Sequence, residues 1–355
     1  FNTIYSENET ASFYLNSNKI SKVEPETTKD YEDYTISDPV ISRNGKLYCS
    51  EEGIKVGFNV SLSYTKESNT LEIYTLPYLI KSYDTKLKSY GYEGVSKDFN
   101  NQKAILYNLF VVEGNNKLYG VINSQNKEII GSRYKNMQFN ENAREFYVMD
   151  TSGKVGIVTE KGDTKINLLY DNISMVDKQN GLYLVRSNNK YGILGNNGEI
   201  IIHLEYDKIG VDVAKFPADT IKNKYVLFEN AIPVYQNKKW GLFDIKGKNI
   251  VPVEFDELGY TKGSSGSLSG KAVNNLLVIP NYKAIVLGKK NDKETLYGIY
   301  SNEGKEFVPC RLTNAYSVVS SGVSTYYMEY QGNTLDIEKY IQRVHGVSEP
   351  IKTEN

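Results

Sequence analysis

Tyr191-Gly192-Ile193-Leu194 opens the stretch YGILGNNGEIIIHLEYDKI, residues 191–209, whose pattern recurs along the chain. Its first four positions are an aromatic or apolar residue, a Gly and two apolar residues. Five copies of this signature begin at Tyr119, Val155, Tyr191, Trp240 and Tyr297. Recurrence on this scale means that one supersecondary unit is copied and stacked. The sequence therefore predicts a repeat architecture.

The residues after each signature glycine also stand at fixed offsets. Six residues on, the copies carry Asn126, Gly162, Gly198, Gly247 and Gly304. Because Gly and Asn tolerate positive φ, this position is predicted to be a left-handed turn between two strands. Fourteen residues after the signature glycine, the copies carry Tyr134, Tyr170, Tyr206, Phe255 and Leu312. Agreement over some twenty positions predicts the same local structure in every copy.

Each unit consists of short apolar runs bounded by Asn, Gly and Ser. In the third copy these runs are residues 182–186, 191–194 and 200–204. Runs of this length and composition predict a meander of antiparallel strands. The signature glycine removes a Cβ, so a neighbouring ring or backbone can lie against that strand. One such unit cannot cover its own apolar face, and its stability therefore requires neighbours.

The spacing between signature glycines identifies two insertions. The gaps are 36, 36, 49 and 57 residues, so the last two are longer. The extra residues fall at 211–230 and 259–283, and the second insertion contains the flexible, linker-like stretch Gly263–Gly270. Insertions in a repeat array map to loops, often on the binding face.

The fourth copy carries a family resemblance. Lys239-Trp240-Gly241-Leu242-Phe243-Asp244, followed by Gly247 and Ile250-Val251-Pro252, resembles the WG repeat, also called KWG, of bacterial surface and secreted proteins. The resemblance extends over residues 100–320 as five repeats, although only one copy keeps the Trp. It implies a β-repeat scaffold and names no reaction.

A different module precedes the array. Residues 39–50 are predicted to form two strands around an Asn44-Gly45 turn, and residues 51–58 a helix with Ser50 as its N-cap. Residues 61–74 alternate like a hairpin. This order resembles the copper amine oxidase N-terminal-like domain of Gram-positive envelope proteins. That domain carries no copper site, and this segment contains no His.

The chain is therefore expected to be mainly β, a small α+β module followed by a tandem array of antiparallel β-meander repeats. The expected divisions are a polar spacer at 1–34, the α+β module at 35–84, the array at 100–320 and a C-terminal cap and tail at 321–355. A short amphipathic helix within residues 333–344 is expected to form the cap. A closed, propeller-like array and an open β-solenoid both suit the pattern, and an elongated particle in small-angle scattering would exclude the propeller.

Composition narrows the class of protein. The chain has 355 residues, 40% hydrophobic and 24% charged, and its 42 basic and 43 acidic residues give a net charge of −1. This balance gives no reason to expect nucleic acid as a partner. No apolar stretch of about 18 residues occurs, so no membrane span is expected. The chain begins with Phe1, which suggests a removed signal peptide or anchor and hence an extracellular or cell-envelope location.

The residues that carry chemistry are few. Cys49 and Cys310 are too few for a multi-bridge disulfide framework. His203 is predicted to lie in a strand and His345 in a solvated tail, with no convergent partners. Catalytic, cofactor-binding and metal-binding residues are therefore all predicted to be none, and no cofactor is expected.

Two recurring residue types have both a structural and a functional interpretation. Asp171, Asp207 and Asp256 are predicted to accept backbone N–H bonds at turns, with metal binding as the alternative. The recurring aromatic residues are predicted to form the core, with a stacking surface for sugar rings as the alternative.

Two functions follow. The first is a non-catalytic scaffold that binds a protein or a cell-wall glycan through the insertions. The alternative is a hydrolase or lyase with Asp and Tyr as acid and base, which two carboxylates and a Tyr within hydrogen-bonding reach in a deep pocket would favour.

Overall fold

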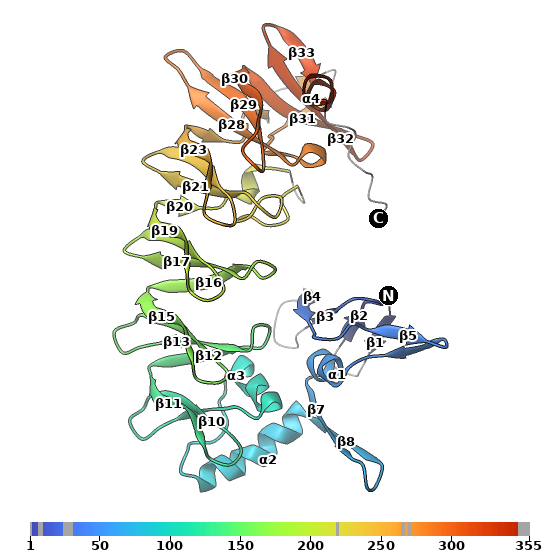
Figure 1. The fold of residues 1–355 in the computed structure, drawn as a ribbon, viewed down its shortest axis with the longest axis vertical. Helices are drawn as coiled ribbons and strands as arrows, with labels where there is room; N and C mark the ends of the chain where they lie inside the picture. The colour runs from blue at the N-terminus through green and yellow to red at the C-terminus, as the bar shows by residue number, and fades with distance from the viewer. Residues whose placement is uncertain are drawn as a thin grey trace. The chain divides into compact units, whose positions relative to one another are not determined.

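The structure is a computed structural model that describes residues 2–5, 10–23, 31–217, 220–263, 267–268 and 271–346 (Figure 1). The chain forms two compact units, Phe1–Leu169 and Tyr170–Asn355. Both consist mainly of antiparallel sheets. The predicted mainly β class, with a small α+β module before an array of β-meanders, is confirmed.

The N-terminal unit starts with a four-stranded antiparallel sheet. Its strands, in chain order, are β1 (Asn2–Tyr5), β2 (Thr10–Phe13), β3 (Lys19–Val23) and β4 (Tyr31–Thr35). This sheet overturns the predicted polar spacer over residues 1–34, of which 1, 6–9 and 24–30 lie outside the described residues. Ala11, Phe13 and Ile20 are buried in its core. Their alternation with polar residues is too sparse to stand out in a polar composition.

The α+β module has the predicted order of strands, helix and hairpin. Its elements are β5 (Ile41–Arg43), β6 (Lys46–Tyr48), α1 (Glu51–Phe58), β7 (Val60–Thr65), β8 (Thr70–Thr75) and α2 (Leu76–Ser89). Asn44 and Gly45 both have positive φ, as the predicted turn requires. The Ser50 hydroxyl accepts a hydrogen bond from the Gly53 amide at 3.2 Å and caps α1 as predicted. Helix α2, however, extends past the expected boundary at residue 84.

Two repeat sheets complete this unit. The first has the order β11-β10-β9, with β9 (Phe110–Glu113), β10 (Tyr119–Ile122) and β11 (Glu128–Tyr134). The second has the order β12-β13-β14-β15, with β12 (Asn136–Asn140), β13 (Glu145–Met149), β14 (Val155–Thr159) and β15 (Thr164–Tyr170). Helix α3 (Phe99–Lys103) and the 3-10 helix η1 (Ala104–Tyr107) precede them. Leu79 and Leu87 of α2 and Ile105 of η1 pack against the first sheet and cover the start of the array.

A cluster of three charged side chains is buried in the same unit. Lys22 on β3 and Lys103 on α3 place Nζ 3.6 and 3.4 Å from one carboxylate oxygen of Glu141. These side chains are only 2–7% exposed. Lys22 also donates a hydrogen bond to Asn59 Oδ1 at 2.9 Å, and the Tyr107 hydroxyl donates to Glu141 Oε1 at 3.1 Å. Two buried ammonium groups therefore share one buried carboxylate.

The C-terminal unit contains four further sheets. The third repeat sheet consists of β16 (Asn172–Asp177), β17 (Leu182–Ser187), β18 (Lys190–Leu194) and β19 (Ile200–Tyr206). The fourth consists of β20 (Lys208–Ile209), β21 (Ile232–Gln236), β22 (Lys239–Phe243) and β23 (Asn249–Phe255). The fifth consists of β24 (Glu257–Leu258), β28 (Ala284–Lys290), β29 (Thr295–Ser301) and β30 (Glu306–Leu312), with β27 (Val278–Ile279) also paired to β28. The short 3-10 helices η2 (Val213–Lys215) and η4 (Pro280–Tyr282) lie in the two insertions.

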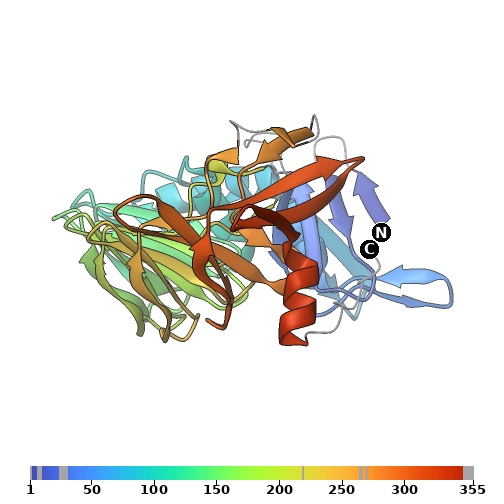
Figure 2. The same cartoon turned by 90° about the horizontal axis from the view of Figure 1, so that it is seen from above.

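The last sheet extends the array beyond the expected end at residue 320. It has the order β25-β26-β31-β32-β33, with β25 (Ser267–Leu268), β26 (Lys271–Asn274), β31 (Asn314–Ser320), β32 (Val323–Tyr330) and β33 (Asn333–Asp336). β32 and β33 carry no copy of the signature, which is why residues 321–336 were expected to belong to the C-terminal cap. The cap helix itself is confirmed as α4 (Ile337–His345), the helix next to the last strands in Figure 2. Its Ile337 and Ile341 side chains pack on the core of this end. Of the predicted linker Gly263–Gly270, residues 264–266 and 269–270 lie outside the described residues.

The strand register explains the signature glycine. Tyr191 lies opposite Tyr206, but Ile193 lies opposite Ile202, so the facing strand has two extra residues across Gly192. The first, fourth and fifth sheets have the same irregularity. A Cβ on Gly192 would lie 2.8 Å from the Ile202 carbonyl oxygen, which is too close for any side chain. The aromatic residue fourteen positions after the glycine is therefore the direct cross-strand partner of the aromatic residue before it.

The second glycine joins one sheet to the next. Gly162, Gly247 and Gly304 have φ of 93°, 84° and 85°, which confirms the predicted left-handed turn. A Cβ at these positions would overlap the carbonyl oxygens of Ile129, Ile201 and Ile250 in the preceding repeat. Each turn thus lies directly on the backbone of its neighbour.

Apolar side chains fill the space between successive sheets within each unit. One core cluster joins the first and second sheets, another the third and fourth, another the fourth and fifth, and another the fifth and last together with α4. This confirms that successive repeat sheets gain stability by covering one another's apolar faces.

Candidate functional site

Both insertions leave the sheets at equivalent points. They connect the first strand of a sheet to its second, β20 to β21 and β24 to β28. Each begins next to a glycine that stands eighteen residues after a signature glycine, Gly210 with φ +90° and Gly259 with φ +77°. The other three copies carry Gln138, Ser174 and Tyr316 at this offset. The sequence analysis did not single out Gly210 and Gly259. Glycine occurs at this offset only in the two copies that are followed by an insertion, and this pattern could have identified both positions.

An aromatic side chain from the first insertion covers each of these glycines. A Cβ on Gly210 would lie 2.7 Å from the Tyr225 ring, and a Cβ on Gly259 would lie 2.7 Å from the Phe216 ring. Only glycine therefore permits both the turn and the close approach of the ring. The two rings flank a hollow of about 570 Å³.

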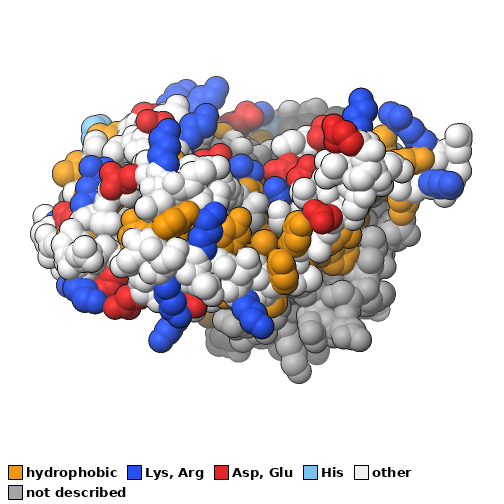
Figure 3. Space-filling view, turned by 90° about the horizontal axis from the view of Figure 1, so that it is seen from below, with side chains coloured by type: hydrophobic (Ala, Val, Ile, Leu, Met, Phe, Trp, Pro, Cys, Tyr) orange, Lys and Arg blue, Asp and Glu red, His pale blue; other side chains and the backbone are white. Residues whose placement is uncertain are grey.

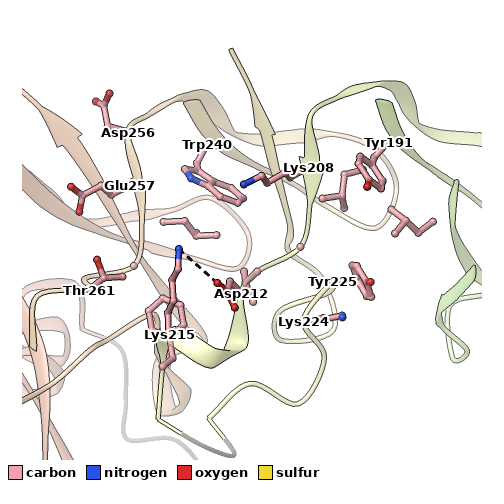
Figure 4. A pocket seen from close by; sticks show the side chains of 17 residues that line it. Tyr191, Lys208, Asp212, Lys215, Lys224, Tyr225, Trp240, Asp256, Glu257 and Thr261 are labelled. Atoms are coloured by element: carbon pink, nitrogen blue, oxygen red, sulfur yellow. Dashed lines mark ion pairs between the residues drawn. The ribbon is translucent and has the colours of Figure 1, made fainter. Parts of the chain in front are cut away.

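This hollow, which we call the insertion pocket, lies within the C-terminal unit (Figure 4). Its lining comes from β17, β18, β20, β22, β24 and the insertions: Leu184, Tyr191, Lys208, Ile209, Gly210, Val211, Asp212, Lys215, Phe216, Lys224, Tyr225, Trp240, Asp256, Glu257, Leu258, Gly259 and Thr261. The sequence predicted that binding would involve the insertions, and both of them line this pocket.

The signature aromatics of two successive repeats meet in the insertion pocket. Tyr191 and Trp240 are both partly exposed there. The Trp240 ring also contacts Tyr235, with 4.8 Å between ring centroids, and this contact fixes its orientation. In the next repeat the equivalent Tyr297 is fully buried, with Tyr260 edge-on against it at 5.1 Å. The insertion pocket therefore lies where the signature rings of two repeats, Tyr191 and Trp240, remain partly exposed to solvent.

The acidic side chains of the pocket already have partners. Asp212 lies 3.8 Å from Lys215 Nζ (Figure 4), and Glu257 accepts hydrogen bonds from the hydroxyls of Thr295 and Tyr297. Asp256 accepts a hydrogen bond from Lys239 Nζ at 2.7 Å.

The basic side chains are less engaged. Lys208 Nζ lies 5.4 Å over the Tyr235 ring, and Lys224 Nζ lies 5.0 Å over the Tyr225 ring. Neither is within 4 Å of a carboxylate in the described part of the chain. Two ammonium groups are therefore available to a ligand.

The recurring aspartates join neighbouring repeats. Asp207 Oδ2 accepts from the Asn237 amide at 3.2 Å, and Asp256 Oδ2 accepts from the Lys290 amide at 2.8 Å, both in the next repeat. Asp171 accepts likewise from the Asn188 amide at 2.9 Å. The predicted backbone-acceptor role is confirmed. Among the described residues no group of three His, Cys, Asp or Glu side chains is placed to hold a metal ion.

The lysine before the signature aromatic was missed at the sequence level. Lys190 and Lys239 donate to Asp207 Oδ1 at 2.6 Å and to Asp256 Oδ1 at 2.7 Å. The first and fifth copies carry Leu118 and Leu296 at the lysine position, and they also lack the Asp, with Lys135 and Thr313 in its place. The lysine and the aspartate therefore occur in the same copies and are missing from the same copies, and this correlation could have revealed the pair.

These hydrogen bonds act on the acidity of the carboxyl groups. The hydrogen bond from Lys190, with a second from the Asn237 amide, lowers the pKa of Asp207. Burial acts to raise the pKa of Asp256, but the hydrogen bonds from Lys239 and the Lys290 amide outweigh it and hold the pKa below its ordinary value.

We expect the Asp256→Asn variant to show a weaker acid dependence of stability. A carboxyl whose folded-state pKa is lowered stabilises the fold above its unfolded pKa of about 4, and this contribution is lost as the pH falls through the folded-state value. At about pH 7 the variant should therefore unfold at a lower urea concentration than the parent. At about pH 3 the difference between the two unfolding midpoints should be smaller. Asp292→Asn, at an exposed carboxylate, is the control. The same difference in unfolding midpoint at both pH values would contradict a stabilising role for the ionised Asp256 carboxylate.

Neither histidine belongs to the insertion pocket. His203 is exposed on β19, as predicted. His345 was expected in a solvated tail, but it ends α4, where Nε2 lies 2.8 Å from the Phe307 carbonyl oxygen. The tail prediction is wrong because the amphipathic helix extends one residue further than expected. Cys49 and Cys310 are both free thiols. Within the described residues, no helix combines the length and apolarity needed to cross a bilayer.

Comparisons with known proteins agree with the repeat pattern. The family profile described as WG containing repeat matches residues 156–191, 191–211 and 240–263. The crystal structure of the computationally designed Ika8 protein is similar over 94% of this chain and 93% of that chain, at 11% identity and a TM-score of 0.23. That of the WD40 beta propeller domain of Doa1 is similar over 92% of this chain and 88% of that chain, at 10% identity and a TM-score of 0.21. TM-scores this low do not establish a shared arrangement of sheets.

No curated protein matches the chain in sequence. The family matches fall on the second, third and fourth copies of the signature, and two of them contribute Tyr191 and Trp240 to the insertion pocket. The chain therefore carries WG repeats at three positions.

Proposed function

We propose that this chain is a non-catalytic scaffold that binds a ligand in the insertion pocket. The observation that carries the proposal is the convergence of Tyr191, Trp240, Phe216 and Tyr225 on one hollow, with glycines at Gly210 and at its equivalent in the next repeat making room for two of the rings. These four side chains pack against the edge of the core but stay partly exposed, and their exposed faces supply large, rigid contact area to a ligand.

The proposed setting is the cell envelope or the extracellular space, and the proposed ligand is a cell-wall glycan or a protein. The WG repeats support this setting, as does the α+β module that resembles the copper amine oxidase N-terminal-like domain of Gram-positive envelope proteins. On the face seen in Figure 3, basic and acidic side chains are interspersed. An interspersed surface does not favour nucleic acid as the partner.

The hydrolase or lyase alternative has weaker support. Asp256 is held ionised by Lys239, so it is a poor general acid at neutral pH. Burial, together with the hydrogen bond to Glu257, raises the pKa of Tyr297, so this phenol is a poor base. The carboxylates and the tyrosine of this region thus form stable pairs, whereas catalysis needs an acid and a base with separated, accessible pKa values.

We expect the Trp240→Ala variant to lose retention of envelope material, because Trp240 supplies the central stacking face. Immobilised protein would be tested on a glycan array and against solubilised cell-wall fractions, and bound material would be compared with the parent. Tyr225→Ala serves as a second pocket variant, since it removes a ring that lies outside the strand ladder.

The control is Tyr78→Ala, which removes an aromatic residue that is 57% exposed in the N-terminal unit. Circular dichroism and urea unfolding would establish that the pocket variants fold. Folded Trp240→Ala and Tyr225→Ala proteins that retain as much material as the parent would contradict the proposal.

A further inference from the structure

We infer that the insertion pocket takes an anionic sugar residue, a pyranose ring that carries a carboxylate or a phosphate. The ring would stack on Trp240, and Lys208, which lies beside it in Figure 4, would pair with the anionic group. This inference rests on the proposed binding function and adds the chemical class of the ligand.

The aromatic part of the pocket suits a ring with one apolar face. Trp240 is oriented by its contact with Tyr235, and Tyr191 lines the same hollow. A volume of about 570 Å³ lies within the range of about 300–1,000 Å³ that is usual for small-ligand sites. An aromatic face binds the C–H face of a sugar, while polar groups around it meet the hydroxyls.

The charges select an anionic ligand. The lining contains three lysines and three acids, so its formal charge is balanced. The acids are already engaged, Asp212 by Lys215, and Asp256 and Glu257 by residues outside the pocket. Lys208 and Lys224 are engaged only with aromatic rings among the described residues. A ligand that stacks on Trp240 and carries one negative group near its ring would therefore find the available ammonium group of Lys208, whereas Lys224 lies apart beside Tyr225 (Figure 4).

The same features argue against a long polyanion. Single-stranded nucleic acid requires a positive track that follows several phosphates in addition to stacking faces. Among the residues that line the pocket, only Lys208 and Lys224 offer available positive charge, and the chain carries a net charge of −1. An oligonucleotide is therefore a competing occupant for the experiment to exclude.

Trp240 is the only tryptophan of the chain, so its fluorescence reports on the insertion pocket directly. The probes are tetragalacturonate as the carboxylate source, phosphomannan as the phosphate source, mannotetraose as the neutral sugar and oligothymidylate as the nucleic acid. We expect one or both anionic sugars to change the emission of Trp240, with affinity that falls as salt is added.

Variants of the two lysines test the charge requirement. Lys208→Gln should weaken binding of the anionic sugar about tenfold, because it removes a charge-assisted hydrogen bond. Lys224→Gln, which removes the ammonium group farther from Trp240, should have a smaller effect. Lys246→Gln, at an exposed lysine in the turn of the same repeat sheet, should leave the affinity unchanged. The parent and all three variants keep Trp240, so one optical readout serves throughout.

The outcomes separate the two proposals. If mannotetraose binds as well as the anionic sugars, or if the lysine variants bind like the parent, the anionic-sugar inference fails while the binding function stands. If oligothymidylate binds most tightly, the inference fails in favour of nucleic acid. If no probe changes the emission of Trp240, and the Trp240→Ala variant retains as much envelope material as the parent, the proposed function fails as well.

Discussion

The Gly247→Ala variant should lose about 3–5 kcal/mol of unfolding free energy. Two effects add at this position. Gly247 has φ +84°, which costs a residue with a Cβ about 1–2 kcal/mol. Its new methyl group would also overlap the Ile201 carbonyl oxygen of the preceding repeat, and backbone cannot move aside as a flexible side chain can. Urea unfolding followed by circular dichroism measures the loss.

Gly322→Ala is the matched control, because Gly322 has φ +79° and open space around its Cβ position. It should lose only the conformational part, about 1–2 kcal/mol. The difference between the two variants isolates the contact between sheets. If both variants lose the same amount, the close approach of each turn to the preceding repeat contributes nothing to stability.

The Glu141→Gln variant should destabilise the N-terminal unit by about 3–5 kcal/mol. The substitution keeps the shape of the side chain but removes its charge. Lys22 and Lys103 would then be two buried cations without the carboxylate that both now contact. Because Lys22 belongs to the N-terminal sheet and Lys103 to α3, loss of the charge should weaken the contact between that sheet and the array.

Hydrogen exchange followed by mass spectrometry would locate this effect, with faster exchange expected first in residues 10–23. Glu93→Gln removes an equally charged side chain from a pair with Lys117, but both partners are more than 70% exposed. It should leave stability unchanged, since exposed pairs contribute little. A Glu141→Gln protein as stable as the Glu93→Gln protein would show that the charge of Glu141 contributes nothing to the stability of this unit.

The regular part of the array could be predicted from sequence because each requirement is local. The signature glycine, the turn glycine and the aromatic residue fourteen positions on all act within one meander, so their spacing survives in the linear order. The sequence did not show, however, where each sheet begins relative to the copies of the signature. The first strand of each sheet, such as β20, follows the aromatic residue of the preceding copy, and its pairing with β21 spans an insertion.

The N-terminal sheet escaped prediction because its core side chains are few and its third strand buries a lysine, Lys22, as well as Ile20. The sequence shows a lysine but not the distant Glu141 that makes its burial possible. Strands β32 and β33 were expected in the C-terminal cap because they carry no copy of the signature.

For the site, the sequence predicted the two insertions but not the residues that line the pocket. Tyr225 and Phe216 are ordinary aromatic residues in irregular loops, and only the folded chain shows which glycine each one covers. The charge selection is equally hidden, since it depends on which carboxylates are already engaged by lysines and tyrosines elsewhere in the chain.

Both insertions connect the first and second strands of a sheet, and the same connection is only a short turn after β12 and after β16. The ladder between the remaining strands does not depend on the length of that connection. A new specificity could therefore be engineered by grafting a loop at 178–181 without redesigning the scaffold, in the way that antibody loops are exchanged on a fixed framework.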